Sequence, residues 1–211
     1  MDKIGIIFDM DGTLWDSAEG VAKSWTRIAD GKYPEPVNIS EADVKGVMGL
    51  TMDKIADKLF PLLDKDARVK LLDECCVEEN AYLREHGGVL YPELEETMQK
   101  LQKKYHLYIV SNCQSGYIEA FLAHYGLEKY FEDIECYGNN GLSKGDNIRQ
   151  VVERNNLSDA CYVGDIQGDF NSSMEAGVKF VHAAYGFGTI DREVPAIKGL
   201  SELPEVLDTV F

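Results

Sequence analysis

The chain has 211 residues, which is enough for one sizeable hydrophobic core or for a core with a small inserted domain. Its formal net charge is −16, and a surface this acidic repels phosphate backbones, so a nucleic-acid partner is not expected. The five cysteines are odd in number and form no CxxC pair. A disulfide framework is therefore not expected, and a reducing compartment fits better.

The first apolar run, residues 4–8, ends at Asp9. A short continuous apolar run of this kind suits a strand that is buried on both faces of a parallel sheet. The run is too short for the core of a signal peptide, and no other segment approaches the roughly 18 apolar residues of a membrane span. We therefore predict a cytoplasmic protein with no membrane partner.

About 95 residues separate this strand from the next apolar run, far more than a βαβ crossover needs. Apolar residues recur at helical spacing in residues 21–29, 55–63 and 69–83, and we find no β-rich segment between them. This pattern predicts that the region is a small helical domain inserted after the first strand.

The predicted boundaries of this cap domain are residues 16–87, inserted into a core formed by residues 1–15 and 88–211. Two glycines, Gly87 and Gly88, follow the last helical pattern and could serve as a hinge, because glycine tolerates large changes of φ and ψ. We expect the two tryptophans, Trp15 and Trp25, to pack the cap against the core.

Strand and helix patterns alternate through the rest of the chain. The predicted strands are residues 107–110, 134–137, 160–163 and 179–183. The predicted helices are residues 92–104, 117–125, 147–156 and 167–176, and the second and fourth each end at a glycine. Such alternation predicts an α/β fold with a Rossmann-like parallel sheet.

Polar residues that could bind a ligand or take part in catalysis lie near the ends of the predicted strands. In open parallel sheets, ligands bind beyond the carboxyl ends of the strands, so these residues are expected to converge. They are Asp9, Asp11, Gly12 and Thr13 after the first strand, Ser111 and Asn112 after the second, Lys144 before a helix, and Asp165 and Asp169 after the strand at 160–163.

Asp9 and Asp11 point the same way if the first strand continues past its apolar run. Two close carboxylates repel each other unless a cation lies between them or one holds a proton. With Asp165 they would form an oxygen-rich site of the kind that suits Mg²⁺. Lys144 and the Ser111 hydroxyl could bind phosphate oxygens, so the set as a whole matches phosphoryl transfer.

These residues carry a family resemblance. Residues 7–14, IFDMDGTL, resemble the first motif of the haloacid dehalogenase-like hydrolase superfamily. Residues 110–112 resemble its second motif, Lys144 its third, and residues 163–169, VGDIQGD, its fourth. The order matches, the resemblance covers nearly the whole chain, and the helical insertion is similar to the family's cap. Among subfamilies the chain looks most like the phosphoglycolate phosphatases.

The resemblance implies a role for each site residue. Asp9 would be the nucleophile and a metal ligand. Asp11 would be the general acid and base, and its backbone carbonyl would also bind the metal. Asp165 would be a direct ligand of Mg²⁺, and Asp169 would hold metal-bound water. The phosphoryl group would be bound by Ser111, the backbone N–H of Asn112, and Lys144.

The implied reaction is Mg²⁺-dependent hydrolysis of a small phosphorylated metabolite, with phosphoglycolate as the first candidate. The pattern departs from close relatives at Gly145, Cys113 and Glu93, which weakens a specific substrate assignment. Phosphoryl transfer of the phosphoglucomutase type, a pyrophosphatase and a non-catalytic binding module stay open as alternatives. The sequence also leaves open a monomer or a homodimer, and whether the loop around Gly49 reaches the substrate.

Overall fold

The computed structural model describes residues 3–211, and its central feature is a six-stranded sheet in the order β5-β4-β1-β6-β7-β8. All neighbouring strands are parallel. The strands are β1 (Ile4–Phe8), β4 (His106–Ser111), β5 (Asp133–Cys136), β6 (Asp159–Gly164), β7 (Lys179–Ala183) and β8 (Ala196–Ile197). This sheet with its flanking helices confirms the predicted α/β, Rossmann-like fold class.

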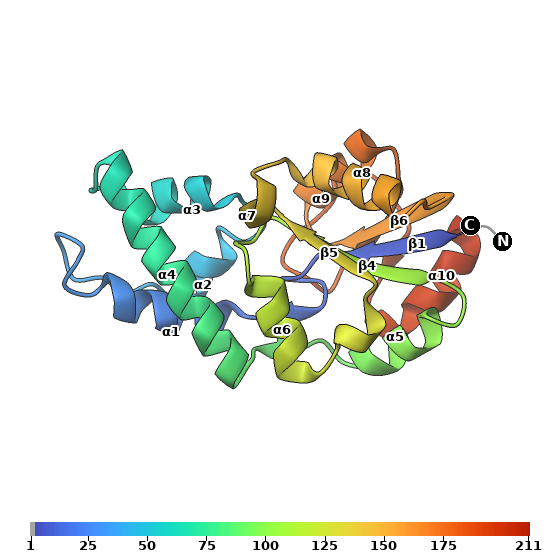
Figure 1. Cartoon of the computed structure of the whole chain (residues 1–211), viewed down its shortest axis with the longest axis horizontal. Helices are drawn as coiled ribbons and strands as arrows, with labels where there is room; N and C mark the ends of the chain where they lie inside the picture. The colour runs from blue at the N-terminus through green and yellow to red at the C-terminus, as the bar shows by residue number, and fades with distance from the viewer. Residues whose placement is uncertain (1–2) are drawn as a thin grey trace.

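Helices cover both faces of the sheet, α8 and α9 on one side and α5, α6 and α10 on the other (Figure 1). Their bounds are α5 (Leu94–Leu101), α6 (Tyr117–Tyr125), α7 (Tyr137–Asn140), α8 (Lys144–Arg154), α9 (Gln167–Ala176) and α10 (Leu203–Val210). Strand β1 is buried on both sides because its side chains alternate between two apolar clusters. Ile6 and Phe8 belong to the larger cluster, and Ile7 belongs to the smaller one under α8 and α9.

Residues 16–87, which lie in the chain between β1 and β4, gather beside one end of the sheet, and most of them are helical (Figure 1). Their helices are α1 (Ala18–Ala29), α2 (Glu41–Lys45), α3 (Met52–Leu59) and α4 (Lys65–His86). We call this segment the insertion. Ser40 and Asp64 begin two of its helices by accepting hydrogen bonds from backbone N–H groups at the helix start.

A two-stranded antiparallel ribbon joins the insertion to the rest of the chain. It pairs β2 (Trp15–Asp16) with β3 (Val89–Leu90). These short strands flank the predicted helical region and were not predicted, because two residues carry no periodicity. The division into two domains stays a prediction, and residues 1–2 of its first segment lie outside the described residues.

The two tryptophans have different surroundings. The fully buried Trp15 ring packs edge-on against Tyr117 and Phe121 of α6, with ring centroids 5.5 and 4.9 Å away. Trp25 lies on α1 and donates a hydrogen bond to Glu79 of α4, so it joins two helices within the insertion. Trp25 also lines a cavity together with Ser111 and Asn112, so the expectation that it packs the cap against the core stays a prediction.

Most predicted elements have their expected position, with small differences at the ends. Helix α8 begins at Lys144 rather than at Asn147, because Ser143 caps it by accepting a hydrogen bond from Asp146 N–H. The short elements α7, β8 and α10 were not predicted. Among the helices of residues 3–211, none has the length and apolar character needed to cross a membrane.

Candidate functional site

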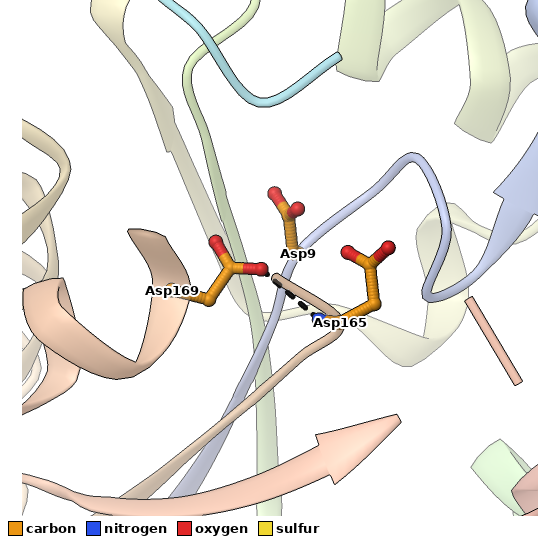
Figure 2. Close-up of side chains that lie close together, drawn as sticks. All are labelled: Asp9, Asp165 and Asp169. Carbon is orange, nitrogen blue, oxygen red and sulfur yellow. Dashed lines mark hydrogen bonds between the residues drawn. The ribbon is translucent and has the colours of Figure 1, made fainter. Parts of the chain in front are cut away.

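Three buried aspartates meet at the carboxyl ends of β1 and β6. Asp9 directly follows β1, Asp165 directly follows β6, and Asp169 lies in the first turn of α9. Each side chain offers an oxygen, and these oxygens lie within 4.8 Å of one another. Figure 2 shows the Asp9 carboxylate between the other two. The topology brings Asp9 and Asp165 together, because the neighbouring parallel strands β1 and β6 end at the same edge of the sheet.

Lys144 neutralises part of this acidic cluster. Its Nζ lies 3.0 Å from Asp9 Oδ1 and 2.6 Å from Asp169 Oδ1, and all three side chains are almost completely buried. Burial opposes the charged form of the lysine, but Asp169 and Asp9 together raise its pKa above the usual value. The ammonium is therefore fixed beside Asp9.

The pKa of Asp9 is raised to about 6, chiefly by burial and further by the charge of Asp169, while Lys144 opposes the rise. The pKa of Asp165 is raised to about 8, again chiefly by burial and then by Asp169 and Asp9. Like charges in a dry site disfavour one another's ionised form unless a cation is present. A divalent cation would remove that penalty, since Lys144 alone leaves an excess of negative charge.

Asp165 is held by the chain segments packed around it. The backbone N–H of Phe187 donates a hydrogen bond of 2.7 Å to Asp165 Oδ2. Gly12 and Gly186 face the same carboxylate, and an added Cβ would lie 2.1 Å from its oxygen at Gly12 and 2.3 Å from Asp165 Cβ at Gly186. Gly12 also has φ of +80°, which favours glycine. Both glycines leave the space that Asp165 occupies.

Asp169 has two structural contacts besides Lys144. Its Oδ2 accepts hydrogen bonds from the backbone N–H groups of Asp165, at 3.0 Å, and Ile166, at 3.1 Å (the former drawn in Figure 2). It thereby caps the N-terminus of α9, where a carboxylate is favoured by the helix dipole. This carboxylate orients both the lysine and the loop that carries Asp165.

The carboxyl of Asp11 lies apart from the cluster, because β1 ends at Phe8 and the chain then turns. Asp11 Oδ1 accepts hydrogen bonds from Ser17 Oγ at 2.6 Å and Tyr117 Oη at 2.7 Å. Burial raises the pKa of Asp11 to about 7, and these two hydrogen bonds oppose the rise. The strand alternation that would have aligned Asp9 with Asp11 therefore does not extend this far, and the two carboxyls have different surroundings.

Ser111 is the last residue of β4 and Asn112 follows it, and both line one cavity together with Asp9 and Asp11. Asn112 Nδ2 donates to the backbone carbonyl of Gly49 at 2.9 Å, so the loop at residues 47–50 of the insertion covers the strand ends. The Asn112 Oδ1 atom is buried and has no hydrogen-bond partner within residues 3–211. An unpaired buried acceptor is costly, and a site that binds a polar ligand can retain one.

The donor set fits Mg²⁺. Carboxylate oxygens from Asp9, Asp165 and Asp169 approach one position, and hard oxygen ligands are those that Mg²⁺ prefers. Cysteine and histidine, which select softer metals, do not take part in this cluster.

Four residues that matter to this geometry were not identified from the sequence. Ser17 and Tyr117 position the Asp11 carboxyl, Phe187 positions Asp165, and Glu79 lines the cavity from the insertion. Ser17 contacts Asp11 across only six residues, whereas the other three act through contacts between segments far apart in the chain. The only signal that could have found one of them is the GFG sequence at residues 186–188, whose glycines permit a close approach of the backbone.

A family model described as "Haloacid dehalogenase-like hydrolase" matches residues 6–183. The chain belongs to the haloacid dehalogenase-like hydrolase family. Its curated relatives include the phosphoglycolate phosphatase of Vibrio parahaemolyticus, 27% identical over 224 residues, with 96% of this chain and 95% of the relative covered. Another is the phosphoglycolate phosphatase of Aquifex aeolicus, 25% identical over 214 residues, with 96% of each chain covered. The predicted resemblance to phosphoglycolate phosphatase-like members is confirmed.

Solved structures share the fold at lower identity. A predicted phosphatase from Clostridium acetobutylicum has a TM-score of 0.80 and 23% identity, over 99% of this chain and 100% of that chain. A 2-haloacid dehalogenase from Pseudomonas syringae has a TM-score of 0.68 and 24% identity, over 100% of both chains. Because one fold hosts both reactions, the chemistry of this hydrolase must be argued from its site residues.

Proposed function

We propose that this chain hydrolyses a small phosphate monoester through a phosphoryl group transferred to Asp9, with Mg²⁺ as cofactor. The observation that carries the proposal is that Asp9, Asp11, Ser111 and Asn112 line one cavity. A nucleophile, an acid with a raised pKa and phosphate-binding groups thus face one space. The relatives named phosphoglycolate phosphatase support the same reaction class.

In the first step, an oxygen of Asp9 attacks phosphorus while the bond from phosphorus to the leaving oxygen breaks. Lys144, 3.0 Å from Asp9, keeps the carboxylate ionised and oriented. Asp11 gives its proton to the leaving alcohol, and a pKa of about 7 suits a group that must hold a proton and then release it. Ser111 and the backbone N–H of Asn112 would bind the phosphoryl oxygens.

In the second step, the ionised Asp11 takes a proton from water, which attacks the phosphorus. The bond between phosphorus and Asp9 then breaks, releasing phosphate and restoring both aspartates. The hydrogen bonds from Ser17 and Tyr117 hold the Asp11 carboxyl in one orientation for both steps. The insertion covers the cavity and would exclude bulk water during the reaction.

We propose that Asp9, Asp165 and the backbone carbonyl of Asp11 would hold the Mg²⁺ ion. Asp169 would orient Lys144 and the loop that carries Asp165. When bound, the ion would neutralise charge on the phosphoryl oxygens. The acidic cluster supports this assignment through its donor chemistry and its spacing.

The direct test measures phosphate release from a panel of phosphate esters, with Mg²⁺ and with excess chelator. The panel contains phosphoglycolate, sugar phosphates, nucleoside monophosphates and pyrophosphate. We expect release from at least one monoester, and its loss when chelator removes the metal. Isomerisation of a sugar phosphate without release would favour a mutase instead. No release of phosphate from any ester of the panel would contradict the proposed hydrolysis.

Metal binding also has a predicted pH dependence that needs no turnover. The pKa of Asp9 rises from 3.8 to about 6, and that of Asp165 from 3.8 to about 8. Without metal, the folded chain holds these protons where the unfolded chain has released them. The free energy of unfolding should therefore fall as pH rises from about 4 to about 8.

Added Mg²⁺ should act in the opposite direction, since it binds the ionised carboxylates and competes with protons. At a concentration tenfold above its Kd, we expect about 1.4 kcal/mol of stabilisation near pH 8, which is about 3–6 °C in Tm. The shift should shrink towards pH 5.5. Thermal unfolding followed by circular dichroism would measure it, and Asp165→Asn is the matched variant that should lose it. An equal shift in that variant would argue against the assigned site.

A further inference from the structure

The insertion forms the wall of the cavity that lies opposite Asp9. The volume of the cavity is about 40 Å³, so it suits a small substrate. The insertion contributes mostly apolar side chains to its wall, among them Val21, Val44, Met48 and Leu50. An apolar wall favours methylene groups and leaves any polar end of the leaving group dependent on a few specific partners.

Glu79 is the one acidic side chain that the insertion adds to this wall. It lies on α4 and is only 3% exposed. Trp25 Nε1 donates a hydrogen bond of 2.6 Å to Glu79 Oε2, which fixes the carboxyl at the cavity wall. Burial raises the pKa of Glu79 to about 8, with the Trp25 hydrogen bond opposing and the Asp11 charge adding to the rise.

The cavity lining contains carboxyl groups but no basic side chain. Its lining contains the carboxyls of Asp9, Asp11 and Glu79, and no lysine, arginine or histidine among residues 3–211. The nearby Lys144 is already paired with Asp9 and Asp169. A carboxylate on the leaving group would therefore be buried without a cationic partner in this lining, which is unfavourable.

An ammonium group on the leaving alcohol would find an acidic partner in this cavity. It would pair with Glu79 in a charge-assisted hydrogen bond and so favour the ionised carboxylate. Its methylene carbons would contact the apolar wall. The excess of negative charge on the whole chain, −16, would also attract a positively charged end towards the site.

We propose that this cavity selects phosphate monoesters of short amino alcohols, with Glu79 as the residue that binds the ammonium end. This inference rests on the proposed phosphatase function for its reaction and adds the class of leaving group. It also separates this chain from the phosphoglycolate phosphatases it resembles, since phosphoglycolate carries a carboxylate at the corresponding end.

The test compares three esters of similar size, namely O-phosphoethanolamine, ethyl phosphate and phosphoglycolate. With Mg²⁺ present, we expect kcat/KM to be at least tenfold higher for phosphoethanolamine than for phosphoglycolate, with ethyl phosphate between them. Glu79→Gln keeps an acceptor for Trp25 but removes the charge. It should lower kcat/KM at least tenfold for phosphoethanolamine and change it less than threefold for ethyl phosphate. Asp73→Asn, on the exposed face of α4, is the control and should change none of the three.

Preference for phosphoglycolate, or an equal loss for all three esters in Glu79→Gln, would overturn the assignment of Glu79 and leave the phosphatase function standing. Calorimetric titration of the Asp9→Asn protein tests binding without turnover. If it binds phosphoethanolamine at least tenfold more tightly than phosphoglycolate while the unmodified protein releases no phosphate, the binding assignment holds and the phosphatase function fails. Equal binding of the two esters would count against the assignment of Glu79.

Discussion

Replacing Asp9 by Asn is expected to abolish phosphate release, with a loss of ~10⁴-fold or more in kcat. The amide cannot act as the nucleophile that accepts the phosphoryl group. It nearly preserves the shape of the side chain, and its carbonyl oxygen can still accept the hydrogen bond from Lys144 Nζ, which lies 3.0 Å from Asp9 Oδ1. The measurement is steady-state phosphate release with the best ester of the panel.

The fold of this variant should survive. The buried Lys144 keeps its ion pair with Asp169, 2.6 Å away, so no charge is left without a partner. Circular dichroism and thermal unfolding would verify this, with Asp73→Asn as the control for a surface carboxyl. Activity above about one per cent of the unmodified rate in a folded Asp9→Asn protein would rule out Asp9 as the nucleophile.

Replacing Asp11 by Asn is expected to lower kcat for alkyl phosphates by about 10²–10⁴-fold. The amide can still accept hydrogen bonds from Ser17 and Tyr117, at the 2.6 and 2.7 Å that Asp11 Oδ1 now shows. It cannot give a proton to the leaving alcohol or take one from water. Both steps of the proposed reaction should therefore slow, while the affinity for the ester changes little.

An aryl ester separates the two steps. A phenolate needs little protonation to leave, so the Asp11→Asn protein should still transfer the phosphoryl group of p-nitrophenyl phosphate to Asp9. Hydrolysis of that intermediate should then be slow, because the base for the attacking water is missing. We expect a burst of p-nitrophenol close to one equivalent of enzyme, followed by slow turnover. Rapid steady release with no burst, at the rate of the unmodified protein, would exclude the proposed role of Asp11.

The strands and most helices could be predicted because each has a local pattern. The apolar run before Asp9 specifies β1 at residues 4–8 as observed, and Gly126 and Gly177 end α6 and α9 in left-handed conformations. The ribbon of β2 and β3 has two residues in each strand, which is too few for any periodicity. Its pairing depends on the insertion bringing Trp15 and Leu90 together.

Some contacts of the site could also be predicted from the sequence, and others could not. Asp9 and Asp165 could be expected to meet because each follows a strand of one parallel sheet. The orientation of Asp11 could not be deduced, since it depends on a turn after β1 and on Tyr117, which lies 106 residues further along the chain. Glu79 could not be recognised either, because a glutamate on a mostly polar helix has no sequence feature that distinguishes a buried position from an exposed one.

The sequence by itself determined the longer strands and helices, the family resemblance and the acidic residues at the strand ends, because these follow from local apolar patterns and short motifs. Only the tertiary structure decided which carboxyl meets which partner. Burial and contacts with side chains far away in the chain raise the pKa values of four carboxyl groups, those of Asp9, Asp11, Asp165 and Glu79. The physical reason is that desolvation and Coulomb interactions depend on distance in space, which the order of residues along the chain does not specify.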